Sequence, residues 1–526
     1  MTIQTKTSDL LSDIGRVESV INEICIASGL KSIALSNVVE FSCGEKGVVL
    51  GFTPDEVQII IMGDYHKIKK GDLIKITGDF LTIDISSKLL GRIINPIGEP
   101  LDEKGRVESE RKRYIESPAK SINERREITS QMNTGYMIID SQIPIGLGQR
   151  EIFIGEKKVH KSDVAMDIIC NQTMIGSGVI CIYVAIDAET SSIKRKIEQL
   201  KKTDALKNTI VVIGRSSDPS SLNYVAPMTA VSIAEGFASE GKDVLIVFDN
   251  LTAHAKVYRQ ISLLLNRAPG REAYPGDVFY LHARLLERCG AFSKAVGGGS
   301  ITAIPLVETQ GEEMTDYIST NLMSITDGHV LFRQALSNKG IQPAIDSGFS
   351  VSRIGGRVQP PLLRELADQI KIIIIRYHEV EKYMVFGTEI KAETLEIIEL
   401  GKRIYQFFYQ DNGNLFNPAE VVAMLYFIVN KYVLEWEVDK MIELRSQLLE
   451  YLGQEENKNK LGYLYRLEDK VKAQDILREL VLGFAQTPNI VHRIEKKVVS
   501  EAEKETIVDL LRDNGDKDVV TRQPKK

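Results

Sequence analysis

The residues from 151 to 169 constrain the fold of this chain more than any other stretch. An apolar run ends at Gly155, five mostly polar residues follow, and Lys161-Ser162 opens an amphipathic segment. This order is typical of a strand, a phosphate-binding loop and a helix, as in the P-loop pattern G-x-x-x-x-G-K-[ST]. The pattern needs a second glycine so that backbone N–H groups can curl around phosphate oxygens, and here that position is His160.

The chemistry of Lys161 and Ser162 could survive this change. The lysine would reach terminal phosphates and the hydroxyl would hold a magnesium ion, both at a helix N-terminus that favours anions. His160 places a β-carbon and an imidazole where a bare backbone is wanted. The loop leaves three alternatives open: a nucleotide site that tolerates the change, a site that has lost its nucleotide but keeps the fold, and a chance resemblance.

Length and composition bound the answer further. At 526 residues the chain is too long for one core, and its 43% hydrophobic and 26% charged residues are those of an ordinary soluble globular protein. No apolar run approaches the roughly 20 residues of a membrane span, and the first residues lack the blocks of a secretory signal, so we expect a cytoplasmic protein. A net charge of −6 argues against a dedicated nucleic-acid binder.

The pattern of the chain predicts several domains. After a short extension at 1–15, residues 16–90 alternate apolar and polar residues with regular turn signals, which predicts an antiparallel β-barrel, although a sandwich fits the alternation equally well. A connector rich in glycine and proline begins at 91 and opens a region extending to 375. Its near-continuous apolar runs predict a buried parallel sheet covered by helices; they lie at 179–186, 209–213, 243–249 and 300–307.

The last part of the chain changes to a helical pattern. Apolar residues recur at i, i+3 and i+4 through 379–402, 418–432 and 463–482, which predicts an α-helical domain over 376–510. The polar residues at 511–526 predict a mobile tail.

Carboxylates follow two of the predicted strands. Asp249 ends an apolar strand, as a Walker-B residue does beside a magnesium ion, although many strands also end in an aspartate that caps a helix. Asp187 and Glu189 lie in the turn after the strand at 179–186, where a water-orienting carboxylate would be expected. A solvated turn explains them as well, and we assign neither as a catalytic base.

An arginine precedes a glycine bend near the end of the central region. Arg353 comes just before Gly355-Gly356, in a position to leave its own domain. The local sequence allows two interpretations: a structural ion pair, or a finger that stabilises charge on a phosphate held elsewhere.

Long stretches beyond these motifs resemble one family. They lie at 144–151, 258–265, 269–282, 284–288, 297–303 and 350–355. Over roughly 16–500 the chain resembles the α subunit of F-type rotary ATP synthases. The resemblance implies a β-barrel, a RecA-like P-loop domain and a helical domain. It also implies a hetero-hexameric ring, in which this chain alternates with a β-type catalytic subunit around a γ-type central shaft.

The resemblance also implies roles for individual residues. Arg353 corresponds to the arginine finger that α supplies to the partner's active site. The chain's own site would normally hold Mg-ATP without turning it over. Its nucleotide residues would be Gly155, Lys157, Lys161, Ser162 and Asp249, of which Ser162 and Asp249 would face the magnesium ion.

The chain departs from the family pattern near this site. Val159 and His160 replace a Thr-Gly pair, Lys157 replaces an arginine, and Ala188 stands where the family has a glutamine. We therefore expect ATP or ADP with magnesium to bind weakly or not at all.

The N-terminus also departs, because only fifteen residues precede Arg16 and family members have a longer extension. This puts coupling to a proton channel in doubt. Divergent rings of this kind are associated with gliding in wall-less bacteria, which would place the chain in the cytoplasm or on the inner face of the cell membrane, with membrane contact only through its complex.

These observations predict a non-catalytic α-like subunit of a rotary ATPase ring, which supplies Arg353 in trans and has a weakened or empty site of its own. Two alternatives stay open. One is a RecA-like hexameric nucleic-acid motor, which the negative charge and the lack of a basic aromatic face at 16–90 disfavour. The other is a purely structural ring subunit, which the presence of Arg353 disfavours.

Overall fold

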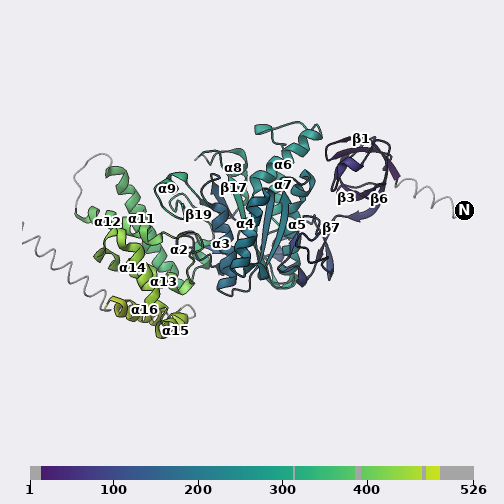
Figure 1. The fold of residues 1–526 in the computed structure, drawn as a ribbon. Helices are drawn as coiled ribbons and strands as arrows, with labels where there is room; N and C mark the ends of the chain where they lie inside the picture. Colours follow the sequence, from purple (N-terminus) through teal and green to yellow (C-terminus); the bar gives the residue numbers. More distant parts are fainter. Residues whose placement is uncertain (1–13, 312–313, 385–391, 465–469, 486–526) are drawn as a thin grey trace, which may run out of the picture. The chain divides into compact units, whose positions relative to one another are not determined.

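The computed structural model describes residues 14–311, 314–384, 392–464 and 470–485, and these form two compact units. The first unit extends to Gln359 and includes Tyr409–Phe416, and the second comprises Pro360–Phe408 and the residues from Asn417 onward (Figure 1). The predicted tail and most of the predicted N-terminal extension lie outside the described residues. No helix among the described residues is long and apolar enough to cross a membrane.

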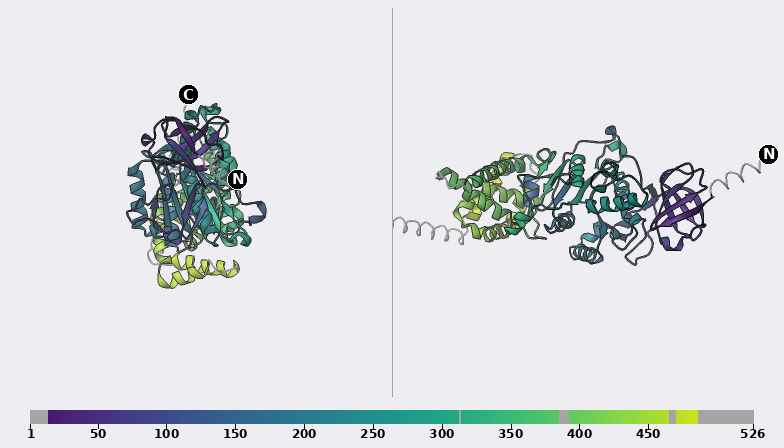
Figure 2. Two further views of the ribbon diagram at one scale, coloured as in Figure 1. Left: turned by 90° about the vertical axis from the view of Figure 1, so that its right-hand side faces the viewer. Right: turned by 90° about the horizontal axis from the view of Figure 1, so that it is seen from above.

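The first domain is a closed antiparallel barrel with the strand order β1-β2-β5-β4-β3-β6, drawn in purple in Figures 1 and 2. Alternate residues point inward, and Val39, Ile59 and Ile74 are fully buried at its centre. The barrel prediction is confirmed, and the sandwich is excluded. The strands are β1 (Ile14–Ile21), β2 (Ile24–Ser28), β3 (Asn37–Phe41), β4 (Lys46–Phe52), β5 (Val57–Ile61) and β6 (Leu73–Phe80).

Two details of the barrel differ from the pattern. The run that begins at Arg16 is not one strand, because Asn22 takes a left-handed conformation with φ 50° and turns β1 back into β2. The alternation at 80–85 does not continue the barrel. Strand β7 (Thr82–Ile85) pairs instead with β9 (Arg111–Tyr114), and its isoleucines are buried against helix α5 (Ser220–Ala238) of the next domain.

The central domain is a nine-stranded, mainly parallel sheet in the order β19-β18-β12-β17-β15-β13-β14-β8, with β16 (Gly290–Ala291) paired to β17. Each long apolar run of the sequence forms a buried strand, so the α/β prediction is confirmed. The strands are β8 (Ile93–Ile94), β12 (Glu151–Gly155), β13 (Ile180–Ala188), β14 (Thr209–Arg215), β15 (Asp243–Asp249), β17 (Ser300–Glu308), β18 (Gly328–Leu331) and β19 (Val351–Ser352).

Helices cover the sheet (Figure 1). They are α3 (Lys161–Met174), α4 (Thr190–Lys202), α5 (Ser220–Ala238), α6 (Leu251–Leu264), α7 (Val278–Leu286) and α8 (Tyr317–Ile325), with the shorter α2 (Met137–Gln142), α9 (Gln334–Asn338) and α10 (Gly355–Val358). Because β12, β13, β15 and β17 are parallel, the loops after them meet at one edge of the sheet, where open α/β sheets bind ligands.

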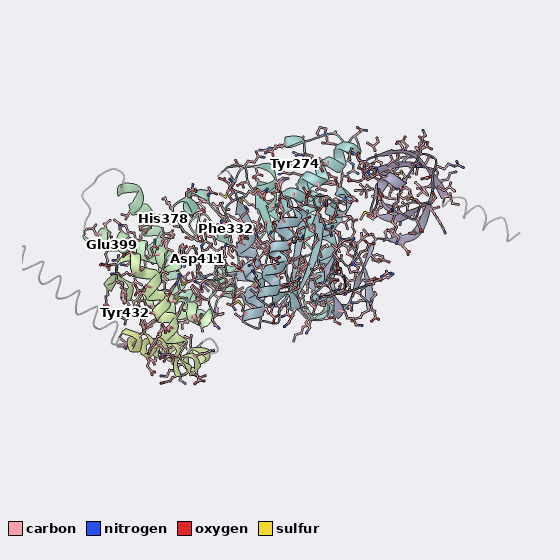
Figure 3. The ribbon with its side chains drawn as sticks, in the orientation of Figure 1. Tyr274, Phe332, His378, Glu399, Asp411 and Tyr432 are labelled. Atoms are coloured by element: carbon pink, nitrogen blue, oxygen red, sulfur yellow. The ribbon has the colours of Figure 1, made fainter. Side chains whose placement is uncertain are left out.

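The second unit is helical, as predicted, and contains α11 (Pro361–Met384), α12 (Ala392–Phe408), α13 (Pro418–Val429), α14 (Met441–Leu452), α15 (Glu455–Leu464) and α16 (Lys470–Ala485). Asn417 and Glu420 form a capping box that starts the apolar helix α13. In Figure 3, His378 and Glu399 mark α11 and α12. The domain boundary predicted after residue 375 falls within α11, and residues 385–391 of the first predicted helical stretch lie outside the described residues.

Candidate functional site

A cavity of about 480 Å³ lies at the carboxyl edge of the central sheet. The loop between β12 and α3, the turn after β13 and the ends of β15 and β17 enclose it. The predicted residues Lys157, Lys161, Ser162 and Asp249 all line this one cavity, and Gly155 ends the strand that leads into it. The order of parallel strands therefore brings together groups that lie almost a hundred residues apart in the sequence.

His160 takes the backbone conformation that the second glycine of a phosphate-binding loop would adopt freely. His160 takes a left-handed conformation, φ 59° and ψ 22°, at the N-cap of α3. Glycine adopts this conformation freely, whereas a side chain makes it unfavourable by about 1–2 kcal/mol. The imidazole Nδ1 lies 2.8 Å from Asp163 Oδ2, and the ring lines the cavity. The histidine therefore changes the surface of the loop more than its course.

Gly155 is required by close packing. A β-carbon at this position would lie 2.4 Å from the carbonyl oxygen of Phe332, which directly follows β18 and is labelled in Figure 3. No L-residue with a side chain fits there without a shift of the backbone. The first glycine of the pattern thus fixes the distance between β12 and its neighbour.

Lys161 is buried and turned back onto its own loop. Its ammonium donates to the carbonyl oxygen of Gly155 at 2.7 Å and to that of Glu156. Burial lowers the pKa of Lys161 to about 8, although nearby carboxylates, Glu308 first among them, oppose the shift. In this arrangement the loop carbonyls occupy the donors that a phosphate would take.

Asp249 is held by three donors from inside the protein. Ser162 Oγ donates to its Oδ1 at 3.1 Å, and the Tyr183 hydroxyl donates to its Oδ2 at 2.8 Å. Lys196 forms an ion pair with the same Oδ2, and its ammonium also donates to the Tyr183 hydroxyl at 2.9 Å. The carboxylate at the expected metal position is thus already neutralised by a buried lysine.

Sequence reasoning missed Lys196, although the sequence carried a signal for it. In helix α4 the buried positions are Ile193, Lys196 and Leu200, which are spaced three and four residues apart. This is the apolar stripe of an amphipathic helix, and a lysine within it must find a buried acceptor. A lysine at this spacing therefore predicts a buried carboxylate partner, which the structure identifies as Asp249.

The turn after β13 also lines the cavity. Asp187 takes a left-handed conformation, φ 52°, and its backbone N–H donates to Asn223 Oδ1 at 2.7 Å. Burial raises the pKa of the Asp187 carboxyl above its usual range. Glu189 is exposed, and Ala188 offers only a methyl group between them. The turn brings carboxylates near the cavity, and no hydrogen bond in the described residues fixes them for proton transfer.

Arg353 follows the edge strand β19, and the turn around it is well held. Its backbone N–H donates to Asp327 at 2.9 Å, and Ser352 Oγ bridges the Pro144 carbonyl at 2.8 Å and the Gly355 N–H at 3.1 Å. The Arg353 side chain is exposed and makes no hydrogen bond or ion pair with the described part of the chain. This argues against the structural ion pair that the sequence allowed.

The strand register separates Arg353 from the chain's own loop. Ser352 pairs with Gly328, and Gly328 pairs with Glu151, so Arg353 lies at the amino end of β12. Gly155 and the loop begin four residues along that strand, about 13 Å away. The two regions therefore lie at opposite ends of the sheet.

Comparisons with known proteins agree with this architecture. Three family models of the ATP synthase alpha/beta family match in chain order: the beta-barrel domain at residues 11–78, the nucleotide-binding domain at 135–352 and the C-terminal domain at 359–481. ATP synthase subunit alpha of Caldanaerobacter subterraneus subsp. tengcongensis is 42% identical over 442 residues, which cover 84% of this chain and 87% of that protein. The chain belongs to the ATP synthase alpha/beta family. It is thus a subunit of an ATPase or ATP synthase complex, as the resemblance implied.

Nucleotide with magnesium is the ligand that this family generally binds, and the residues of this chain fit its two parts unequally. The phosphate side keeps Lys161, Ser162 and a loop of the right course. The metal side does not fit, because both oxygens of Asp249 are engaged by protein donors and Lys196 supplies the opposing charge.

Proposed function

We propose that this chain is a non-catalytic α-type subunit of a rotary ATPase ring. It alternates with a β-type catalytic subunit in a hetero-hexamer around a γ-type shaft, and the ring couples shaft rotation to ATP hydrolysis or synthesis. The identity to an ATP synthase subunit alpha across 84% of the chain supports this assignment. Such a ring is cytoplasmic or peripheral to the inner face of the membrane, and it has no nucleic-acid partner.

Arg353 is the residue by which this subunit takes part in the reaction. The observation that carries this proposal is its exposed guanidinium, which has no hydrogen-bond or ion-pair partner among the described residues and directly follows the edge strand β19, at the end of the sheet away from the chain's own loop. A side chain in that position cannot reach a phosphate held after Gly155. It is available to a phosphate bound by a neighbouring subunit, which is the chemistry of an arginine finger.

The chain's own site is weakened in this proposal and does not hydrolyse nucleotide. His160 places an imidazole in the phosphate loop, and Ala188 supplies no polar group at the turn after β13. Asp249 is neutralised from within the protein. Three neighbouring positions thus lack what hydrolysis needs, whereas the turn around Arg353 is intact.

The test is the ATPase rate of the ring assembled with its β-type partner. Replacing Arg353 by alanine should lower kcat by about 10³-fold or more, because an arginine finger stabilises charge only in the transition state. Arg357→Ala is the matched control, since Arg357 is also exposed and lies four residues away. An assembled ring that hydrolyses ATP equally well with Arg353→Ala would refute the proposal.

A further inference from the structure

The buried lysine in the nucleotide pocket is the feature that the proposed function leaves unexplained. Lys196 is only 5% exposed, and it stands on the apolar face of α4. Lysine is rarely buried to this degree unless it is paired. Its ammonium reaches Asp249 and the Tyr183 hydroxyl, and it lies 5.3 Å from the centre of the tyrosine ring. These three side chains form one closed polar cluster.

The cluster occupies three of the roughly four acceptor positions of the Asp249 carboxylate and places a buried ammonium beside it. Its Oδ2 receives the ammonium of Lys196 and the hydroxyl of Tyr183, and its Oδ1 receives the hydroxyl of Ser162. Asp249 is itself 9% exposed, so the ion pair is sheltered from water. Magnesium requires oxygen ligands in a near-ideal octahedron, often with several waters. Here the carboxylate that would face the ion is already paired with the Lys196 ammonium.

A metal ion could bind beside Asp249 only if the Lys196 ammonium moved away from that carboxylate. Asp249 and Tyr183 are its hydrogen-bond acceptors in the described part of the chain. Breaking a buried pair leaves an uncompensated charge, which is strongly unfavourable. An ammonium that stayed in place would repel the divalent ion at close range.

We propose that the Lys196 ammonium replaces the divalent cation in this pocket, so that the pocket takes the polyphosphate of a nucleotide without its metal. With Asp249 neutralised by Lys196, the countercharge for the phosphates comes from other side chains that line the same cavity: Lys157, Lys158, Lys161, Arg195 and Lys256. This inference deepens the proposed weakening of the chain's own site. It does not involve Arg353, so the two proposals can fail separately.

The decisive experiment measures binding of labelled ATP to the isolated full-length chain, once with excess Mg²⁺ and once with EDTA. For the unaltered chain we expect weak binding with the same affinity in both conditions. Lys196→Met removes the internal cation, and its affinity for ATP should become about 10-fold or more higher with Mg²⁺ than with EDTA. Lys201→Met, at an exposed position of the same helix, should behave as the unaltered chain.

Manganese alone provides a second readout. Electron paramagnetic resonance of added Mn²⁺ should show one additional bound ion per chain in Lys196→Met, and this ion should be lost again when Asp249→Asn is added. Magnesium-dependent ATP binding by the unaltered chain overturns the proposal without any variant. A folded Lys196→Met chain that gains neither the manganese site nor magnesium dependence overturns it as well.

The variant chain must be shown to fold, because Lys196→Met leaves a buried carboxylate without its cation. Circular dichroism and the unfolding midpoint are the checks. Lys196→Gln keeps a hydrogen-bond donor beside Asp249 while removing the charge, and the same gain of metal dependence is expected from it. If neither variant folds, equal ATP affinity of the unaltered chain with Mg²⁺ and EDTA supports the proposal, and unequal affinity overturns it.

Discussion

The two ends of the central sheet differ in how their charged side chains are paired. At the carboxyl edge, the loop at 155–162 keeps its course while His160 and Lys196 fill positions around the phosphates and the metal. At the amino edge, the turn around Arg353 is held by Ser352, and the guanidinium has no partner among the described residues. Under the proposed function, the same fold would keep a weakened site at one edge of the sheet and a residue that acts on a neighbour's site at the other.

The largest expected effect tests the end that is proposed to act. Replacing Arg353 by lysine keeps the positive charge but loses the planar fork that binds two phosphate oxygens at once. We expect ring ATPase to fall by about 10³-fold, nearly as far as with alanine. The measurement is steady-state hydrolysis by the assembled ring. A lysine variant with full activity would mean that a positive charge alone suffices at this position and that the planar fork of the guanidinium is not needed.

The second effect is a loss of folding stability in acid, which would unfold the domain that carries both ends of the sheet. His254 on α6 donates to the Tyr224 carbonyl at 2.9 Å, and its Nδ1 lies 3.2 Å from His282 Nε2. Burial lowers the pKa of His254 to about 4, from 6.5, and lowers that of His282 well below its usual range. A depressed folded pKa means that the stability is fully present above pH 6.5 and is lost as the pH falls toward about 4.

The acid loss from His254 alone amounts to about 3 kcal/mol of unfolding free energy. Urea unfolding of the full chain at several pH values between 6.5 and about 4 measures it. His254→Gln, which keeps a donor to the Tyr224 carbonyl without the titration, should flatten this pH dependence. An unchanged slope in that variant would assign the acid loss to other groups.

The sequence predicted the scaffold well because its signals are local. Period-two alternation gives the barrel, and near-continuous apolar runs such as 243–249 give the buried parallel strands. The P-loop and Walker-B patterns predicted that Ser162 and Asp249 would face the same magnesium ion, and the structure places Ser162 Oγ 3.1 Å from Asp249 Oδ1. These predictions needed only the period of the pattern and the polarity of a parallel sheet.

The parts that the sequence did not predict depend on which partner a side chain meets. Lys196 was not identified from the sequence, because its acceptor Asp249 lies 53 residues away in the chain. The alternation at 80–85 suggested another barrel strand, but Ile83 and Ile85 are buried against the next domain. Whether Arg353 forms an ion pair also could not be decided locally, because the nearby Asp327 is taken by Arg150.

A third, smaller effect tests how the turn that carries Arg353 is held in place. Ser352→Ala removes the hydroxyl that joins the Pro144 carbonyl, the Gly355 N–H and the Gln149 amide. We expect a loss of about 1–2 kcal/mol in unfolding free energy. Ring kcat should fall by about 10-fold, since Arg353 is then less well oriented. Ser352→Thr, which restores the hydroxyl, is the control. Equal activity of the alanine variant would show that the turn does not position the arginine.

The smallest effect concerns the altered loop itself. His160→Gly relieves a left-handed conformation that is unfavourable by about 1–2 kcal/mol for a residue with a side chain. Glycine also gives the unfolded chain more freedom, so the net gain in unfolding free energy should be only about 0.5–1 kcal/mol. Urea unfolding measures it, with His160→Ala as the control that removes the imidazole but keeps the β-carbon.

If His160→Gly is no more stable than His160→Ala, the left-handed backbone conformation at this position does not reduce the unfolding free energy of the unaltered chain. ATP binding separates the effect of His160 from that of Lys196 at this end of the sheet. Removing the imidazole should raise the affinity for ATP equally with Mg²⁺ and with EDTA, because Lys196 still neutralises Asp249. A gain seen only with Mg²⁺ would mean that the histidine, rather than the buried lysine, keeps the metal out.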